Sequence, residues 1–235
     1  MNAAIRLVAF GLVCAGLAVG SSDAGEKANP ATKLINRDVQ RHKDFLAIAK
    51  KGGVEVVFIG DSITQGWENN KTWKKYFEPL KAANFGISGD QTGHVLWRIT
   101  EGGELDSIKP KVAVVMIGTN NSYVHSAEQI SGGITEIVKT IHKKTPTTKV
   151  LLLGVFPRGA KGGTPIRAKL DEINKTIAKL DDGGKTVKFL DIGERFLEKD
   201  GSLSMEVMPD FLHLSGKGYE IWAEAINPTL TEMLK

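Results

Sequence analysis

Five short and nearly continuous apolar runs, separated by segments of helical periodicity, constrain this sequence more than any other feature. The runs are rich in Val, Ile and Leu. Strands that helices cover on both faces have this unbroken apolar character. The alternation of such strands with helices predicts a five-stranded parallel sheet with right-handed crossovers and helices on both faces. The predicted strands are Val54–Ile59, Ala83–Ile87, Val112–Ile117, Val150–Val155 and Val187–Ile192.

Helical patterns fill the intervals between these runs. Apolar residues at helical spacing predict a first helix over Lys33–Lys50, which Gly52 and Gly53 would end. The pair Gly132-Gly133 interrupts a later helical pattern and would suit a loop or a helix end. The chain of 235 residues suits one α/β domain, and no linker divides it. Further helices are expected at Trp73–Lys81, Thr92–Thr100, Ala127–Lys144, Ile166–Leu180 and Gly218–Leu234.

The first residues have the order of a secretory signal peptide. Arg6 precedes an apolar run from Leu7 to Val19, and small residues follow. The run is shorter than the about 20 apolar residues that span a bilayer comfortably. Cleavage after Gly20 or Ala24 would give a secreted or periplasmic protein without a stable membrane anchor; an uncleaved anchor and a buried first helix are the alternatives. The expected divisions are a signal peptide (1–24), a polar lead with the first helix (25–50) and one domain (51–235).

Composition and charge argue against several classes of function. The only cysteine, Cys14, lies in the segment that export would remove, so the mature chain would lack a thiol for a disulfide, a nucleophile or a metal site. The net charge is +4, and its basic residues form no run that would track nucleic acid. The histidines lack ligand spacing such as HExxH, and "GISGDQTG" matches no nucleotide-phosphate loop. We therefore expect neither a metal, a cofactor nor a nucleic-acid partner.

Polar, glycine-marked turns follow three of the predicted strands. The first strand runs into "GDSIT", the second into "FGISGDQTG" and the third into "IGTNNS", while "MPDFLHLSGKGY" precedes the last helix. The carboxyl ends of parallel strands meet at one edge of the sheet, where open α/β folds bind their ligands. Residues far apart in the sequence are therefore expected to converge at this edge.

These turns contain the groups that acyl transfer needs. The reaction requires a hydroxyl that loses its proton to a base, and a partner that orients the base. Ser62 supplies a hydroxyl, His213 an imidazole, and Asp210, three residues earlier, a carboxylate on the same loop. An oxyanion also needs preorganised donors. The candidate donors are the backbone N–H groups of Ser62 and Gly89 and the side-chain amide of Asn120 or of its neighbour Asn121.

Simpler interpretations exist for each of these residues. Ser62 could be a helix N-cap, Asp210 could cap the residues after it, and His213 could be a surface histidine. Asp61 and Asp90 are expected to be turn residues that support the site, because an Asp side chain in a turn can bond nearby backbone N–H groups.

The same motifs resemble the sequence blocks of the SGNH (GDSL-type) hydrolases. "GDSI" is similar to the block that contains the nucleophile, "GTNN" to the block with the oxyanion-hole Asn, and "DFLH" to the block with the Asp and His. The stretch from Val54 to Tyr219 is most similar to one branch of that family, the catalytic subunits of intracellular platelet-activating factor acetylhydrolase.

This resemblance implies a flavodoxin-like, three-layer α/β/α sandwich around the five-stranded parallel sheet. It also implies Ser62 as the nucleophile, His213 as the base and Asp210 as its partner, with the backbone N–H of Ser62, Gly89 and Asn120 forming the oxyanion hole.

The resemblance further implies a small acyl pocket. Ile63, Thr119 and Leu212 match positions that close a pocket suited to acetyl, and side chains of this size would exclude longer chains. The sequence thus predicts an exported serine esterase that removes short acyl groups from a small-molecule or carbohydrate ester. Dimers occur among the relatives, so a homodimer is the candidate assembly. A longer-chain lipase or thioesterase of the same mechanism, and a catalytically silent binding protein on the same fold, are the alternatives.

Overall fold

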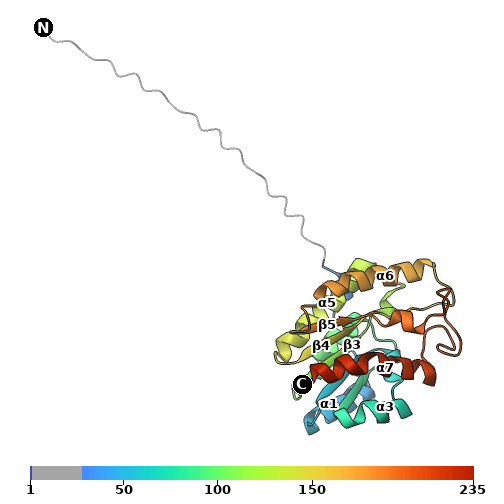
Figure 1. The fold of residues 1–235 in the computed structure, drawn as a ribbon. Helices are drawn as coiled ribbons and strands as arrows, with labels where there is room; N and C mark the ends of the chain where they lie inside the picture. Colours follow the sequence, from blue (N-terminus) through green and yellow to red (C-terminus); the bar gives the residue numbers. More distant parts are fainter. Residues whose placement is uncertain (2–27) are drawn as a thin grey trace.

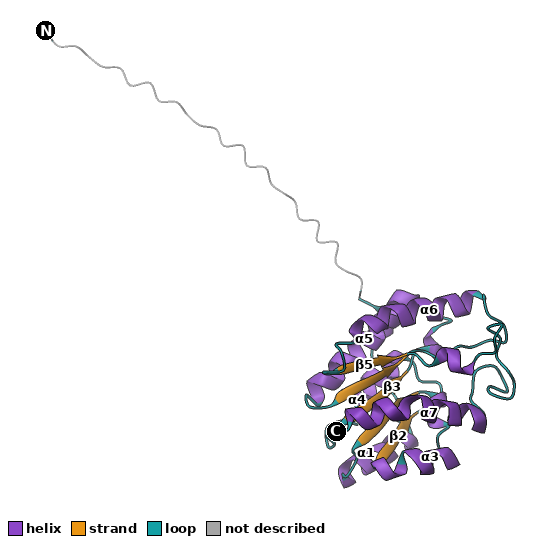
Figure 2. Cartoon of the chain, in the orientation of Figure 1, coloured by secondary structure: helices purple, strands orange, loops and turns teal. Residues whose placement is uncertain are grey.

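The computed structural model describes Met1 and residues 28–235 and contains one parallel sheet between two layers of helices (Figures 1 and 2). The strand order is β2-β1-β3-β4-β5, and all pairs are parallel. This is the order of flavodoxin-like sheets, which bind ligands where the order reverses, between β1 and β3. The predicted fold is confirmed, and each strand end lies within two residues of its predicted position. The strands are β1 (Val56–Gly60), β2 (Ala82–Gly86), β3 (Val112–Met116), β4 (Lys149–Leu153) and β5 (Val187–Leu190).

The helices divide between the two faces of the sheet. None of those between residues 28 and 235 combines the length and the hydrophobicity that crossing a membrane requires. One face is covered by α1 (Gln40–Lys51), α4 (Thr92–Ile99), α5 (Ala127–Lys144) and α6 (Pro165–Ile177). The other face carries α2 (Ser62–Gln65), α3 (Lys71–Tyr76) and α7 (Gly216–Met233). Short 3-10 turns are η1 (Pro30–Thr32), η2 (Glu78–Leu80), η3 (Thr119–Asn121), η4 (Ala178–Leu180) and η5 (Gly193–Phe196).

The core has two halves, one on each face of the sheet. Along β1, Val57 and Ile59 pack with the α1, α4 and α5 layer, whereas Val56 and Phe58 pack with α7. Successive side chains of a strand point to opposite faces. Since both faces of β1 are covered, every one of its residues is buried, which explains the unbroken apolar run in the sequence.

The first helix begins at Gln40, not at Lys33 as the sequence pattern predicted. The residues before it are held by contacts to distant parts of the chain. The Ile35 N–H donates to the Gly93 carbonyl oxygen at 3.1 Å, and the Arg37 guanidinium binds Asp90. Leu34, counted as part of the apolar helix face, is 40% exposed. These tertiary contacts outweigh the local helical preference and bring the segment before α1 to the edge where β2 ends.

Two further elements differ from their predicted form. The helix expected over Trp73–Lys81 ends at Tyr76, and Pro79 lies in the turn η2 that follows it, since Pro has no N–H to continue a helix. The helix α5 instead continues through Gly132 and Gly133. A side chain at Gly133 would come within 2.8 Å of Thr92 Oγ1, so this glycine permits close packing of α5 against the start of α4.

Candidate active site

Ser62 is the first residue of the short helix α2, and only Asp61 separates it from the end of β1. The Asp61 side chain accepts a hydrogen bond from the Ile63 N–H at 3.0 Å and so caps this helix. The interpretation of Ser62 as the N-cap is therefore wrong, because Asp61 has that role. The helix packs closely on the end of β2: a side chain at Gly86 would lie 2.3 Å from the backbone nitrogen of Gln65.

Ser62, His213 and Asp210 lie within hydrogen-bonding distance in series. Ser62 Oγ is 2.9 Å from His213 Nε2, and His213 Nδ1 is 2.7 Å from Asp210 Oδ2. The other carboxylate oxygen of Asp210 accepts the backbone N–H groups of His213 and Leu212 at 2.7 and 3.1 Å. The carboxylate therefore folds back onto its own loop and reaches the imidazole across only three residues.

This loop is shaped by an unusual backbone conformation. Phe211, between Asp210 and Leu212, has a φ of 57°, which non-glycine residues adopt uncommonly. Burial acts to raise the pKa of Asp210, but the hydrogen bonds from the His213 ring and the neighbouring N–H groups outweigh it and hold that pKa below its usual value. Asp210 is therefore an ionised carboxylate at neutral pH and can stabilise a protonated imidazole.

Gly89 and Asn120 lie in the turns that follow β2 and β3. Gly89 is exposed, and its φ of 82° favours glycine. Asn120 Nδ2 donates to the backbone carbonyl oxygen of Asp90 at 2.9 Å, which joins the two turns. Since a side-chain amide carries two N–H groups, this bond leaves the second one for another acceptor.

The neighbouring Asn121, the alternative donor, is buried, and its side chain is bound to Thr92 and His125. Its Oδ1 accepts the Thr92 N–H at 3.0 Å, and its Nδ2 lies 3.0 Å from Thr92 Oγ1 and 3.2 Å from His125 Nδ1. Asn121 thus ties η3 to the start of α4. Asn120 is the residue of the pair whose amide joins the β2 and β3 turns.

The three residues predicted to line an acyl pocket differ in accessibility. Ile63 and Thr119 are each 1% exposed, whereas Leu212 is only partly buried. Thr119 Oγ1 and its carbonyl oxygen each accept a hydrogen bond from Arg158 Nη1 at 3.1 Å. A cavity of about 400 Å³ lined by residues of α1 and α3, including Trp73, contains none of these three residues. Leu212 is therefore the accessible member of the predicted pocket.

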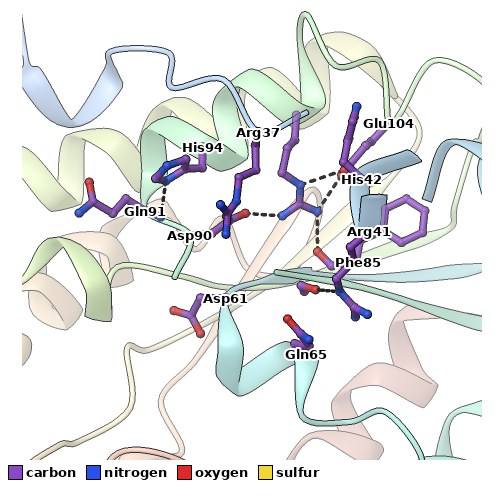
Figure 3. Close-up of polar contacts among 12 residues, drawn as sticks. Arg37, Arg41, His42, Asp61, Gln65, Phe85, Asp90, Gln91, His94 and Glu104 are labelled. Carbon is purple, nitrogen blue, oxygen red and sulfur yellow. Dashed lines mark hydrogen bonds and ion pairs between the residues drawn. The ribbon is translucent and has the colours of Figure 1, made fainter. Parts of the chain in front are cut away.

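The two aspartates expected to support the site are both fully buried. Asp61 caps α2 through one carboxyl oxygen, and its Oδ2 has no partner in the described part of the chain. Asp90 is instead bound through both oxygens: Arg37 Nε lies 2.7 Å from Oδ1 and Arg98 Nη1 2.7 Å from Oδ2. Figure 3 shows the Asp90 side chain directed toward the arginines and away from Asp61.

No sequence motif pointed to these arginines or to Arg158. One signal was available for Arg98: it lies within the apolar stretch "HVLWRI" of a predicted helix, where a charge is expected to need a buried partner. Arg37 offered no such signal, because its segment was interpreted as helix. Among residues 28–235, no group of three or more His, Cys, Asp and Glu side chains could hold a metal ion.

Known proteins resemble this chain in sequence and in fold. The GDSL-like lipase/acylhydrolase family matches residues 58–221. Platelet-activating factor acetylhydrolase IB subunit alpha1 of Rattus norvegicus is 42% identical over 219 residues, covering 90% of this chain and 93% of its own. A GDSL-like lipase from Bacteroides thetaiotaomicron has a similar fold, with a TM-score of 0.67 at 21% identity over 81% of this chain and 97% of its own. An acetylxylan esterase from Geobacillus stearothermophilus has a TM-score of 0.58 at 18% identity over 77% of this chain and 94% of its own.

Replacing Asp61 by Asn should change how stability depends on pH. Burial raises the pKa of Asp61 to about 7 from 3.8. Because the folded-state pKa is raised, this carboxyl contributes most to the free energy of unfolding at low pH, where it is protonated in both the folded and the unfolded state. The contribution is lost as the pH rises toward and through 7. The unfolding free energy of D61N should therefore gain on the wild type by about 2–4 kcal/mol between pH 5 and pH 8.5. Urea unfolding of both proteins at several pH values measures this gain.

The matched control for this experiment is Asp200→Asn. Asp200 is exposed, and its pKa lies below the usual value because it accepts hydrogen bonds from Ser202, so it stays ionised from pH 5 upward. The difference between D200N and the wild type should stay constant over the range. A D61N difference that is equally constant would show that Asp61 does not titrate there.

Proposed function

The chain belongs to the GDSL-like lipase/acylhydrolase family and is a carboxylic ester hydrolase, and from this premise we propose that Ser62 is its nucleophile. The observation that carries the proposal is the pair of contacts at 2.9 and 2.7 Å that links Ser62 to His213 and His213 to Asp210. A hydroxyl, an imidazole and a carboxylate in that order are what covalent acyl transfer by serine requires.

In the proposed mechanism, His213 moves the protons. With its Nδ1–H donated to Asp210, Nε2 accepts the Ser62 proton as Oγ attacks the ester carbonyl carbon. The imidazolium then protonates the leaving alcohol while the carbon–oxygen bond to that alcohol breaks, and an acyl-serine remains. Water, deprotonated by the same imidazole, then attacks the acyl carbon. The bond from that carbon to Ser62 Oγ breaks, the imidazolium returns its proton to Oγ, and the carboxylic acid is released. Asp210 remains ionised throughout and holds the imidazole ring in place.

We assign the oxyanion hole to the backbone N–H groups of Ser62 and Gly89 and to the free N–H of Asn120. The burial of Asn121 supports the choice of Asn120 as the side-chain donor. Loss of one such donor typically slows acyl transfer by about 100- to 1,000-fold. The donors act only if they point at the oxygen before the reaction begins, so the hydrogen bond between Asn120 and Asp90 is a supporting feature.

The acyl group is proposed to be short, and acetyl is the simplest candidate. The relatives at 42% identity are named as acetylhydrolases. Ile63 and Thr119 are buried under the site, and the partly buried Leu212 stands beside His213, so added methylenes on the acyl chain would meet packed side chains.

The alcohol half of the ester is proposed to be carbohydrate. The loops that carry Asn120 and Asp210 expose apolar side chains, namely Tyr123 (74% exposed), Val124 (65%) and Met205 (63%). Arg158 lies over the Tyr123 ring at 4.7 Å and holds it beside η3. An exposed, supported aromatic face next to a site suits the flat apolar face of a sugar ring. The fold also occurs in an acetylxylan esterase. The same exposed apolar side chains favour the second candidate, a lipase acting on longer acyl chains.

Export by residues 1–24 remains part of the proposal. The cation Arg6, the apolar run after it and the small residues that follow support it. These residues lie outside the part of the chain that the structure describes, Met1 excepted. N-terminal sequencing of the protein isolated from its natural compartment tests it, and a chain that retains residues 1–24 inside the cell would contradict it.

Ser62→Ala and His213→Ala should each reduce the hydrolysis of p-nitrophenyl acetate by at least about 1,000-fold, because each removes a group that takes part in the bond changes. Steady-state rates of the variants, with circular dichroism to verify folding, measure this. Ser107→Ala, an exposed serine between α4 and β3, is the control and should keep its rate. A fluorophosphonate probe should label Ser62 of the wild type. Unlabelled, folded wild-type protein would favour the catalytically silent alternative.

The wild type should prefer short acyl chains. Across p-nitrophenyl esters from acetyl to octanoyl, kcat/KM should fall by at least about 10-fold beyond butyryl, since one misfit methylene is worth about 1–3 kcal/mol in a closed pocket. Leu212→Ala should reduce this preference by enlarging the pocket at its accessible side. A wild type that hydrolyses octanoyl esters faster than acetyl esters would support the lipase alternative instead.

Tyr123→Ala should weaken the hydrolysis of acetylated xylo-oligosaccharides selectively. Loss of one aromatic stacking face should raise KM by about 5- to 10-fold, while p-nitrophenyl acetate hydrolysis stays unchanged. Tyr123→Phe keeps the ring and should behave as the wild type. Equal losses on both substrates in Y123A would contradict a sugar-stacking role.

A further inference from the structure

A buried ionic network includes Asp90, in the turn that follows β2, together with Glu104 and His42 (Figure 3). Three of its members, Asp90, Arg98 and Glu104, are fully buried, and His42 is nearly so. None of them was expected to act in catalysis. Their position is notable because Asp90 directly follows Gly89 and because its carbonyl oxygen accepts the Asn120 amide.

Arg98 is the centre of this network. Its Nε and Nη2 bind the two oxygens of Glu104 at 2.9 and 2.8 Å, and its Nη1 binds Asp90 Oδ2 at 2.7 Å. Nη2 also donates to the Phe85 carbonyl oxygen in β2 at 2.6 Å. The network is closed by His42 of α1, whose Nδ1 lies 2.8 Å from Glu104 Oε1. The guanidinium is therefore held at a fixed place relative to the sheet.

Arg37 binds the same turn from the solvent side. Its Nε binds Asp90 Oδ1 at 2.7 Å, and its Nη2 donates to the Ser88 carbonyl oxygen at 2.5 Å. The side chain is 25% exposed and comes from the non-helical segment before α1. Residues 88–90 thus lie between one arginine anchored in the core and one anchored at the surface.

Stability alone is a weak reason for such an arrangement. Taking charges out of water is unfavourable, and buried ion pairs can often be replaced by apolar side chains without loss of stability. A planar guanidinium does, however, bind its acceptors in a fixed orientation. A carboxylate held at both oxygens by two such groups can neither rotate nor shift, and neither can the peptide groups attached to it.

We propose that Arg37 and Arg98 are positioning residues, which fix Asp90 and thereby aim the Gly89 N–H and the Asn120 amide at the oxyanion. The inference rests on the proposed function, because it presumes that those two groups are the donors. The Gly89 N–H belongs to the same peptide group as the Ser88 carbonyl oxygen, which accepts a hydrogen bond from Arg37, and the Asn120 amide donates to the Asp90 carbonyl oxygen. A misplacement of about 1 Å in such a group can slow a reaction by about 100-fold.

Arg37 is the informative residue to change, because it is partly exposed and its loss leaves Asp90 paired with Arg98. Arg37→Met should lower kcat for p-nitrophenyl acetate by about 10- to 100-fold with KM changed by less than about 3-fold, since the donors act on the transition state. The kcat of Arg37→Lys should lie between those of the wild type and R37M, because one ammonium group cannot reproduce the forked guanidinium that binds both Asp90 and Ser88. Arg195→Met, an exposed arginine in η5, is the matched control.

The decisive readout is the inhibition constant of 1,1,1-trifluoroacetone. The serine oxygen adds to its carbonyl carbon and gives a hemiketal whose oxygen occupies the oxyanion hole. In R37M the inhibition constant should rise by the same factor as kcat falls, and R195M should leave both unchanged. An arginine that only supports folding would lower the fraction of titratable sites and the Tm, while kcat per active site and the inhibition constant would stay at the wild-type values.

Hydrogen exchange separates a failure of this inference from a failure of the proposed function. Amides of residues 88–91 should exchange faster in R37M than in R195M, whether or not esters are hydrolysed. A wild type that is as inactive as S62A would contradict the proposed function. Unchanged exchange in R37M would then also contradict the positioning role of Arg37. An active wild type with an R37M variant of full kcat and unchanged inhibition would overturn the positioning role alone.

Discussion

The parallel pairing of β1 with both of its neighbours is the constraint on which the site depends. In this register Gly60 stands opposite Gly86 of β2 and Met116 of β3, so the three strands end level with one another. The turns that follow them therefore begin at one edge, and Ser62, Gly89 and Asn120 lie at that edge although they come from three parts of the chain. A shift of one residue in a strand would turn its side chains to the opposite face. Because the side chains of β1 differ in size and are closely packed on both faces, such a shift would create clashes and cavities and is disfavoured.

The same edge carries features that are unfavourable in isolation. Asp61 is a buried carboxyl whose Oδ2 has no partner among the described residues, Phe211 has a positive φ, and Arg98 is a fully buried guanidinium. Each is stabilised by specific contacts. Asp61 caps α2, the Asp210 carboxylate bonds to N–H groups of its own loop, and two carboxylates bind Arg98. Unfavourable local states of this kind gather at functional sites because precise placement of reactive groups is what they provide.

The N-terminal segment shows how tertiary contacts redirect a local preference. Residues 33–39 have apolar spacing that favours a helix, yet they form none, since Ile35 bonds to Gly93 and Arg37 to Asp90. The segment thereby becomes part of the surroundings of the site. Arg158 acts similarly from the other side, where it binds Thr119 beneath an exposed tyrosine while the following Gly159 N–H bonds to the Phe211 carbonyl oxygen. Hydrogen bonds thus join the segment 33–39 to the turn of Asp90, and the loop of Arg158 to η3 and to the loop of Phe211.

The sequence by itself determined the parallel sheet, the strand ends and the polar residues that follow them, because period and glycine-marked turns are local properties. The motifs also placed the chain in its family, and their spacing selected Ser62, Asp210 and His213. Only the tertiary structure decided that Asp61 rather than Ser62 caps α2, that Asn121 is buried while Asn120 joins the turns, and that Arg37 and Arg98 hold Asp90. These outcomes depend on which groups, far apart in the sequence, come within hydrogen-bonding distance. Local sequence patterns contain no information on such distances.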